Sequence, residues 1–274
     1  MPKLPLTHGP RMTMPFRPPD RSNLIFAFLG AILVVFVAGP LLYLLLRAEP
    51  GTLGQAFTDR ELMASISLTL LAATAATLLG ALLGVPLAYL LAGRPFPGRT
   101  LIQGLVELPI VIPHPVAGIA LLLFLGRHSA VGGALGKIGL EFVSHVPGIV
   151  AAMLFVSVPI LVSGSREAFA GIDPHLARAA RSLGDSPARC FRRVTLPLAS
   201  RGILAAVSLA WARAVSEFGA IVILTYNPKV TSVLIFDRFT SFGLEAAIPP
   251  AIILLVIALA MFGLIRFLQP TIPQ

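Results

Sequence analysis

The stretch Leu62–Ala92, LMASISLTLLAATAATLLGALLGVPLAYLLA, contains no charged side chain. A helix crosses the roughly 30 Å hydrocarbon core of a bilayer with about 20 apolar residues. Because this stretch is longer than that, it can tilt within the membrane or extend beyond it. It therefore predicts a membrane-spanning helix, and with it a protein that folds in lipid.

Five further stretches have the same apolar character, so we expect six spans. The chain of 274 residues is 56% hydrophobic and only 12% charged, whereas soluble domains carry about 25% charged residues. We therefore expect an all-α integral membrane protein with one membrane domain, residues 24–265, and no room for a soluble catalytic domain. The other expected spans are Leu24–Leu46, Leu108–Leu125, Val146–Ser165, Leu198–Leu224 and Ala246–Ile265.

The distribution of basic residues predicts the orientation in the membrane. Cytoplasmic segments carry an excess of Lys and Arg, and this bias appears here when the N-terminus is placed inside. Both termini are then expected to be cytoplasmic. The net charge of +9 follows mainly from this topology, so nucleic acid is not an expected partner. The inner basic residues are Lys3, Arg11, Arg17, Arg21, Arg94, Arg99, Arg166, Arg178, Arg181, Arg189, Arg192, Arg193 and Arg266.

The two ends of the chain are expected to be cytoplasmic tails, residues 1–23 and 266–274. The first tail is basic and Pro-rich and lacks the small-residue cleavage site of a secretory signal. The span that follows it is also too long for the apolar core of a signal peptide. We therefore expect the first tail to be disordered rather than a removed leader.

The longest cytoplasmic connection, Arg166–Pro197, contains recognisable helix boundaries. Asp173–Pro174 has the pattern of an N-cap followed by Pro at the first helical position, and Gly184 is placed to end that helix. Ser186–Pro187 repeats the N-terminal pattern, so a second short helix is expected over about Pro187–Val194, with the closing proline ending the segment. Together they predict a compact cytoplasmic protrusion. An amphipathic loop on the membrane surface is the simpler alternative.

This connection resembles the EAA loop of ABC-importer permeases. AARSLG, residues 179–184, is followed after nine residues by VTLP, residues 194–197. The family pattern is Glu-Ala-Ala, three residues, Gly, nine residues, Ile, any residue, Leu-Pro. Arg178 replaces the usual Glu and Val194 the usual Ile; the Arg reverses a charge, so a salt bridge made by the family's Glu is not expected here.

The resemblance implies a type I ABC importer permease fold and a function for this loop. In that family the loop is the coupling helix, which sits in a groove on a separate ATP-binding subunit. The break at Gly184 and the new helix start at Pro187 would keep this helix short and rigidly aimed, so that it could act as a lever for the contact. The residues implicated by the resemblance are Arg178, Ala179, Ala180, Leu183, Gly184, Asp185, Ser186, Pro187, Leu196 and Pro197.

Other stretches resemble the molybdate, tungstate and sulfate permeases. LPIVIPHPVAGI, residues 108–119, is similar to their third span, and WARAVSEFGA, residues 211–220, to their fifth. The Pro-His pair, with YNPK at 226–229 and LIFDRF at 234–239, is closest to the molybdate/tungstate branch. Sulfate permeases share much of the fifth-span pattern. The resemblance covers most of the chain and implies import of a tetrahedral oxyanion that a separate binding protein mainly selects.

The third span contains too many prolines for one regular helix. Pro109, Pro113 and Pro115 each lack an N–H and clash with the preceding turn. Broken backbone at membrane depth is tolerated where protein or a watery cavity satisfies it. Leu108–Gly118 therefore either lines the translocation pathway or is a kink where a helix enters the membrane. His114 is a pathway candidate, or a hydrogen-bonded interface residue.

Arg213 and Glu217 are the charged pair expected near the middle of the fifth span. Four residues apart, they would share one face of a helix, and charges at this depth usually face the bundle interior or a watery cavity. The pair is either structural and self-neutralising, or Arg213 attracts the dianion while Glu217 orients it. Glu217 is the one carboxylate that we expect inside a span.

Several absences narrow the function. The sequence has no GxxxxGK[ST] phosphate loop, no Cys/His cluster with metal-ligand spacing and no nucleophile–base pair. We therefore expect no catalytic residue, metal or cofactor in this chain, with ATP and Mg bound by a partner ATPase. A secondary transporter or channel is a rival of another class, and would need an internal repeat or a relay of intramembrane carboxylates.

The expected assembly lies in the inner membrane of a prokaryote. Two copies of this permease, or this chain with a paralogue, would join a dimer of ATP-binding subunits. An extracytoplasmic oxyanion-binding protein would deliver the substrate, and membrane lipid would surround the spans. Alternating access driven by ATP is the expected mechanism.

Overall fold

The computed structural model describes residues 21–49, 51, 54, 56–93 and 95–268. Residues 1–47 and 48–274 form two separate units. The first contains α1 (Arg21–Leu46), an apolar helix that passes through Pro40 and is long enough to cross a membrane. It agrees with the first expected span. Most of the expected tails, residues 1–20 and 269–274, lie outside the described residues.

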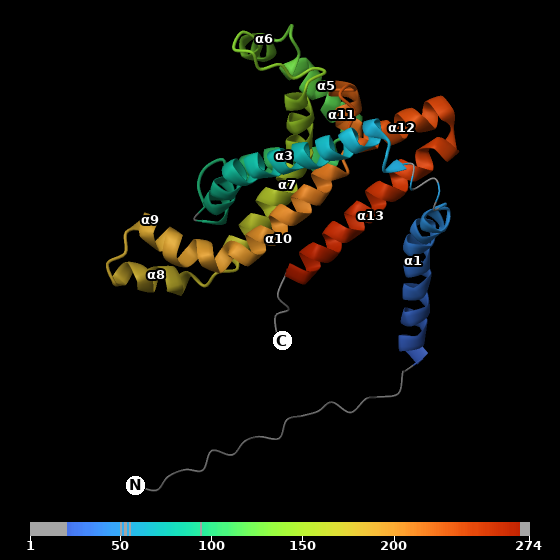
Figure 1. Cartoon of the computed structure of the whole chain (residues 1–274). Helices are drawn as coiled ribbons and strands as arrows, with labels where there is room; N and C mark the ends of the chain where they lie inside the picture. Colours follow the sequence, from blue (N-terminus) through green and yellow to red (C-terminus); the bar gives the residue numbers. More distant parts are fainter. Residues whose placement is uncertain (1–20, 50, 52–53, 55, 94, 269–274) are drawn as a thin grey trace. The chain divides into compact units, whose positions relative to one another are not determined.

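Three long helices form the centre of the second unit (Figure 1): α3 (Arg60–Ala92), α7 (Val146–Ala170) and α10 (Leu196–Val215). They pack against one another and bury two clusters of aliphatic side chains. Small residues let them approach closely, as in other membrane bundles. A Cβ on Gly84 of α3 would lie 2.9 Å from the side chain of Leu161 on α7.

The expected third span, Leu108–Leu125, is not a single helix. Helices α4 (Arg99–Val111) and α5 (His114–Leu125) form it instead, and they are bent by 117° at the break between them. Pro113 caps α5 and Pro115 lies in its first turn, where a missing N–H removes no hydrogen bond. The break predicted from the prolines is therefore confirmed, although Pro109 remains inside α4.

The expected fifth span, Leu198–Leu224, is wrong at its outer end. Helix α10 stops at Val215, and a separate short helix, α11 (Gly219–Leu224), packs against α5. Helices α12 (Thr231–Phe242) and α13 (Leu244–Leu268) follow and pack against each other. The described residues contain five helices able to cross a membrane, or up to six if the bent pair counts as one span.

The long connection begins as predicted and ends differently. Helix α8 (Pro174–Ser182) is capped by Asp173. Helix α9 (Pro187–Cys190) continues through a π turn, η1 (Phe191–Thr195), directly into α10. The expectation that Pro197 ends the segment is wrong, because Pro197 lies in the first turn of α10, where proline is compatible with a helix.

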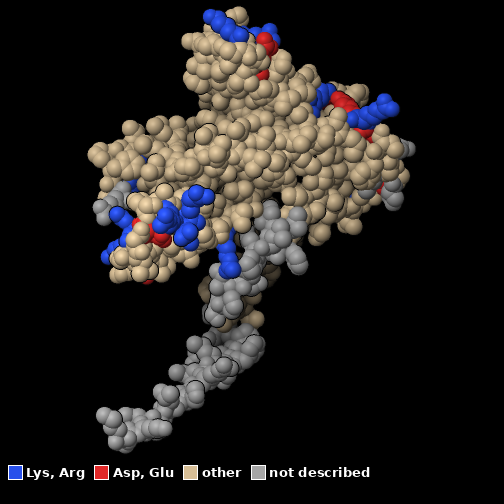
Figure 2. Space-filling model, turned by 60° about the vertical axis from the view of Figure 1, so that its left-hand side comes forward, with Lys and Arg blue, Asp and Glu red and all other residues tan. Residues whose placement is uncertain are grey.

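Charged side chains gather at the ends of the second unit, and a broad uncharged surface lies between them (Figure 2). They occur near α8 and α9, near α12, and near the short helix α6 (Ala130–Gly136). Leu71, Leu82 and Leu123 are among the large apolar side chains that remain exposed. Such a band is what a lipid-facing surface requires.

Candidate functional site

Arg213 is the centre of a polar cluster in which α5, α10 and the segment before α11 meet. Its Nη2 atom lies 2.8 Å from Oε2 of Glu217 and 2.7 Å from Nε2 of His114. Its Nη1 atom also donates to Oγ of Ser216 at 3.4 Å. Two spans that are broken in the fold are thus joined through one guanidinium.

Glu217 is the buried member of the cluster, with a side chain only 1% exposed. One carboxylate oxygen accepts from Arg213, and the other accepts from the backbone N–H of Ala220 at 2.8 Å. The Oγ of Ser232 donates to the Glu217 carbonyl oxygen at 2.7 Å. The ion pair suggested by the sequence forms, but not on one helix face, because α10 ends at Val215 and Glu217 lies beyond it.

His114 accepts a hydrogen bond at Nε2, because an Arg side chain has donors only. The same nitrogen of Arg213 lies 3.5 Å from Nδ1 of His114. A Cβ on Gly219 would lie 2.7 Å from Cβ of His114, and a Cβ on Gly118 would lie 2.8 Å from the carbonyl oxygen of Ala220. Only glycine at these positions allows α5 and α11 to approach this closely.

The guanidinium of Arg213 is not fully enclosed. The side chain is 22% exposed, and its contacts use only part of the five N–H donors of an Arg. Pro113 and Pro115 are exposed at the bend beside it. The structure thus brings His114, Arg213 and Glu217 together and leaves the two prolines at the edge of the cluster.

Trp211 connects this cluster to the central helices. It is the single Trp of the chain, and its Nε1 donates to Oγ1 of Thr74 on α3 at 3.1 Å. Because Trp211 lies two residues before Arg213, the end of α10 is tied to α3 beside the charged pair.

The segment expected to contact an ATPase is strongly exposed. No residue of α8 is buried, and Leu183 is 90% exposed. The backbone N–H of His175 donates to Oδ1 of Asp173 at 2.8 Å, which fixes the start of α8. Gly184 has φ +95°, a left-handed conformation that glycine adopts without strain. The two short helices are therefore joined at Leu183–Gly184 as predicted.

Arg178, which replaces the usual Glu of the family pattern, lies on α8. Its Nε donates to the carbonyl oxygen of Pro174 at 3.4 Å, and within the described residues it has no acidic partner. Asp185 lies 3.6 Å from Arg189, and Ser186 caps α9. The other implicated residues are Ala179 and Ala180 on α8, Pro187 at the start of α9, and Leu196 and Pro197 at the start of α10.

An aromatic cluster that sequence reasoning did not identify anchors this segment. Phe191 of η1 packs on Tyr89 of α3, with ring centroids 4.7 Å apart, and lies 6.2 Å from Phe169 of α7. Tyr89 and Phe169 are themselves 5.3 Å apart. The exposed helices α8 and α9 are thus followed by a turn, η1, whose Phe191 packs against two central helices, α3 and α7.

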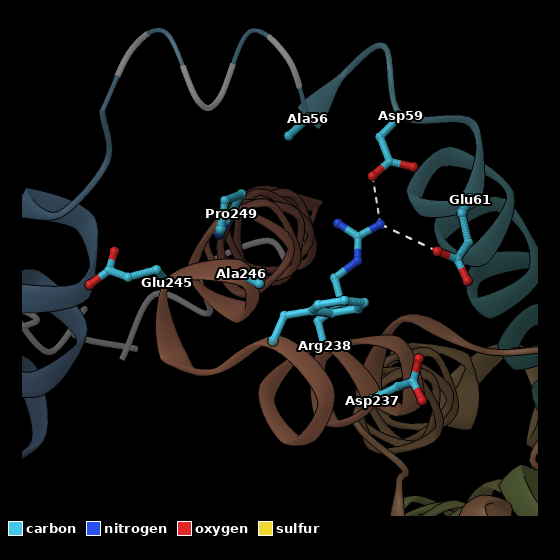
Figure 3. A pocket seen from close by; sticks show the side chains of 9 residues that line it. Ala56, Asp59, Glu61, Asp237, Arg238, Glu245, Ala246 and Pro249 are labelled. Atoms are coloured by element: carbon cyan, nitrogen blue, oxygen red, sulfur yellow. Dashed lines mark hydrogen bonds and ion pairs between the residues drawn. The ribbon is translucent and has the colours of Figure 1, made fainter.

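A second charged cluster lies at the other end of α3, beside an open pocket of about 450 Å³ (Figure 3). Arg238 of α12 donates to Asp59 and Glu61. Lys229 lies 2.7 Å from Asp237 and 3.3 Å from Glu61. These contacts tie α12 to the start of α3. The pocket is lined by Ala56, Asp59, Glu61, Asp237, Arg238, Phe242, Glu245, Ala246 and Pro249.

The hydrogen bonds of this outer cluster shift its titrations. The bond from Lys229, and then that from Tyr226, lowers the pKa of Asp237, and the same contact with Asp237 raises the pKa of Lys229. Burial acts to raise the pKa of Asp59, but hydrogen bonds from Leu62 and Arg238 outweigh it and the pKa is lowered. These shifts favour the charged forms of Asp59, Lys229 and Asp237.

Glu107 is a second carboxylate within a candidate span, and the sequence analysis missed it. It lies on α4, where Gln103 donates to its Oε1 at 3.1 Å and Ser163 of α7 donates at 3.4 Å. The signal was present, because α4 starts at Arg99 rather than at Leu108. Placing the span boundary at Leu108 excluded Glu107 from the membrane.

Residues 84–273 match the family described as binding-protein-dependent transport system inner membrane component, and the chain belongs to this family. The molybdate/tungstate transport system permease protein WtpB of Pyrococcus furiosus is 42% identical over 252 residues, which are 90% of this chain and 96% of that protein. The sulfate transport system permease protein CysT of Salmonella typhimurium is 32% identical over 77% of this chain and 78% of that protein. The chain is a transport permease subunit rather than an enzyme.

Solved structures agree on the fold. The chain superimposes with a TM-score of 0.70 on a bacterial ABC transporter involved in the import of alginate, at 21% identity, covering 91% of this chain and 97% of that one. An amino acid ABC transporter gives a TM-score of 0.58 at 21% identity, covering 79% of this chain and 96% of that one. The expected type I ABC importer permease fold is confirmed.

Proposed function

We propose that this permease imports a tetrahedral oxyanion, molybdate or tungstate, in an ATP-driven complex. The observation that carries the proposal is the 42% identity to a molybdate/tungstate permease over 96% of its length. Sulfate is the second candidate, supported by a relative with lower identity and coverage. An ATP-independent transporter or channel is the alternative of another class.

The polar cluster is the proposed contact with the dianion. Arg213 keeps part of its guanidinium exposed at the meeting point of two broken spans, and such breaks line substrate sites in other transporters. Glu217 partly neutralises the cation, so the anion is attracted without being trapped. His114 and the exposed prolines Pro113 and Pro115 would form the adjoining wall. A purely structural ion pair is the competing interpretation.

The exposed segment α8–α9 is the proposed contact with a dimer of ATP-binding subunits, which would hold ATP and Mg. Leu183, Gly184 and the residues from Asp185 to Pro187 would enter the groove of that subunit. The aromatic base at Phe191 supports a rigid connection to the membrane helices. A permease homodimer, an extracytoplasmic binding protein and two cytoplasmic termini complete the proposed arrangement.

Uptake by reconstituted vesicles tests the proposal. The vesicles contain the complete complex and are supplied with labelled molybdate, tungstate or sulfate. The binding protein is added on the side of the membrane that exposes the extracytoplasmic face of the permease. We expect ATP-dependent uptake of molybdate and tungstate that exceeds sulfate uptake. Sulfate uptake alone would favour the second candidate, and uptake without ATP would contradict the ATP-driven mechanism.

A further inference from the structure

We propose that Arg192, Arg193 and Arg201 form a binding surface for the phosphate groups of anionic phospholipids. We call these three residues the arginine stem. The proposal goes beyond the transport function, and it uses only one part of the proposed arrangement, namely that α8–α9 projects from the membrane into water.

The charges of the arginine stem are not compensated within the chain. All three side chains are exposed, and none has a hydrogen bond or an ion pair to any described residue. Between Asp185 and Glu217 the sequence contains no acidic residue at all. A ligand from outside the chain must therefore supply the counter-charge, or water must solvate it.

The position of Arg201 makes full solvation of its charge by water unfavourable. Pro187–Val215 forms one candidate span, and Arg201 lies about 7.5 Å along α10 from Leu196 at the usual helical rise. Leu198 and Leu204 beside it are 52% and 63% exposed, so this face of α10 is apolar apart from the Arg. A cation at such a site extends toward the headgroup layer.

The local geometry places a second cation in line with it. Arg193, Pro197 and Arg201 are four residues apart in turn, a spacing that puts them on one side of a helix, and all three are exposed. Phe191 meanwhile packs inward on Tyr89. The row of Arg side chains therefore runs from η1 into the first turns of the span, across the layer where lipid phosphates lie.

Lipid phosphate fits this row better than a protein partner does. Arg pairs with phosphate through two parallel hydrogen bonds. Each basic residue next to a span also raises the affinity for anionic lipid by about fivefold. A second copy of the same basic face would repel it. The groove of an ATPase would receive the exposed α8 and Leu183, whereas Arg201 is flanked by leucines that face hydrocarbon.

Electron paramagnetic resonance of spin-labelled lipids tests the proposal in bilayers that contain the whole complex. We expect wild-type protein to retain labelled phosphatidylglycerol at least about fivefold more than labelled phosphatidylcholine. The triple variant R192Q/R193Q/R201Q should lower this ratio toward one. The matched control Arg181→Gln removes an exposed Arg from α8 and should leave the ratio unchanged.

Further arms separate the competing explanations. If the triple variant does not fold, Arg201→Gln alone should lower the ratio and Arg201→Lys should largely keep it. Replacing chloride with inorganic phosphate at equal ionic strength should not displace the labelled lipid; displacement would show a free-phosphate site and overturn the proposal. An unchanged ratio in the triple variant together with loss of the ATPase on purification would assign the surface to the ATPase instead.

Discussion

Arg213 and Glu217 each make a further contact besides their ion pair. Arg213 also donates to His114, and Glu217 also accepts from the backbone of Ala220. Exchanging the two charges would break the contact with Ala220, because an Arg cannot accept a hydrogen bond from a backbone N–H. Removing both charges is therefore a cleaner test of the pair than exchanging them.

Arg213→Gln should destabilise the protein by about 3–5 kcal/mol, because it leaves a buried carboxylate without its cation. Adding Glu217→Gln should recover about 2 kcal/mol of the free energy of unfolding, since the unpaired charge is gone. Denaturant unfolding in detergent measures both. A double variant no more stable than Arg213→Gln would contradict the coupling.

Uptake by the same double variant decides between the two roles of Arg213. If it folds but imports little oxyanion, the guanidinium contacts the substrate. Normal uptake would leave the pair a structural role only.

The ion pairs of the outer cluster predict that the stability of the folded protein decreases at acidic pH. The pKa of Asp237 is lowered in the folded protein, so its contribution is present above the unfolded value of about 3.9 and is lost as pH falls through the folded pKa. Asp237→Asn should therefore lower the Tm at pH 7, and this effect should shrink as the pH falls below the unfolded value. The loss at pH 7 should be under about 1 kcal/mol, because the Lys229–Asp237 pair is partly exposed to solvent.

Glu245→Gln is the matched control for this cluster. Glu245 lines the same pocket and has no hydrogen bond or ion pair to a described residue. Its replacement should change Tm equally little at pH 3 and at pH 7. A loss for Asp237→Asn that is the same at pH 3 as at pH 7 would argue against the ionic contribution.

At the scale of single helices, the left-handed joint at Gly184 is the clearest target. Gly184→Val forces a β-branched residue into φ +95° and should cost about 1–2 kcal/mol locally. Gly184→Asn keeps a residue that tolerates this conformation and is the matched control. We expect the Val variant to insert normally but lose substrate-stimulated ATP hydrolysis and uptake in the complex, while the Asn variant retains both. Normal import by the Val variant would refute the coupling assignment.

Helix boundaries marked by a cap, a proline or a glycine were predictable, whereas the end of α10 was not, because the marking residues act locally. Asp173, Pro174 and Gly184 act on backbone groups within one turn, so their pattern is visible in the sequence. The end of α10 at Val215 interrupts an apolar run whose composition does not change, and a hydropathy pattern carries no information on backbone direction. For the same reason the hydropathy pattern did not reveal that α4 starts at Arg99, and Glu107 was therefore not assigned to a span.

At the scale of the whole molecule, accessibility to reagents tests the proposed orientation. In a Cys190→Ala background, Ser241→Cys on exposed α12 should react with an impermeant thiol reagent from outside the cell. Ala179→Cys on α8 should react only after the membrane is opened. Both positions are exposed, so failure to react would reflect sidedness. The reverse pattern of labelling would invert the topology. Lys229, by contrast, is a poor position because its ammonium pairs with Asp237.

The class of the molecule could be predicted because its signals are spread over the chain. Span composition and the loop motif identified the permease fold and most of its spans. The meeting of His114 with Arg213 could not be predicted, because these residues are far apart in sequence and the contact depends on the 117° bend and on two glycines that allow α5 to touch α11.

Trp211 gives this chain an optical readout of its own. As the only tryptophan, it confines the indole fluorescence of the subunit to one place, two residues from Arg213 and bonded to Thr74 across the α3–α10 contact. Any shift of α10 against α3 would change the polarity around the indole and hence its emission wavelength. The intrinsic fluorescence of Trp211 can thus report movements of this subunit during the transport cycle, with no dye attached and no residue replaced.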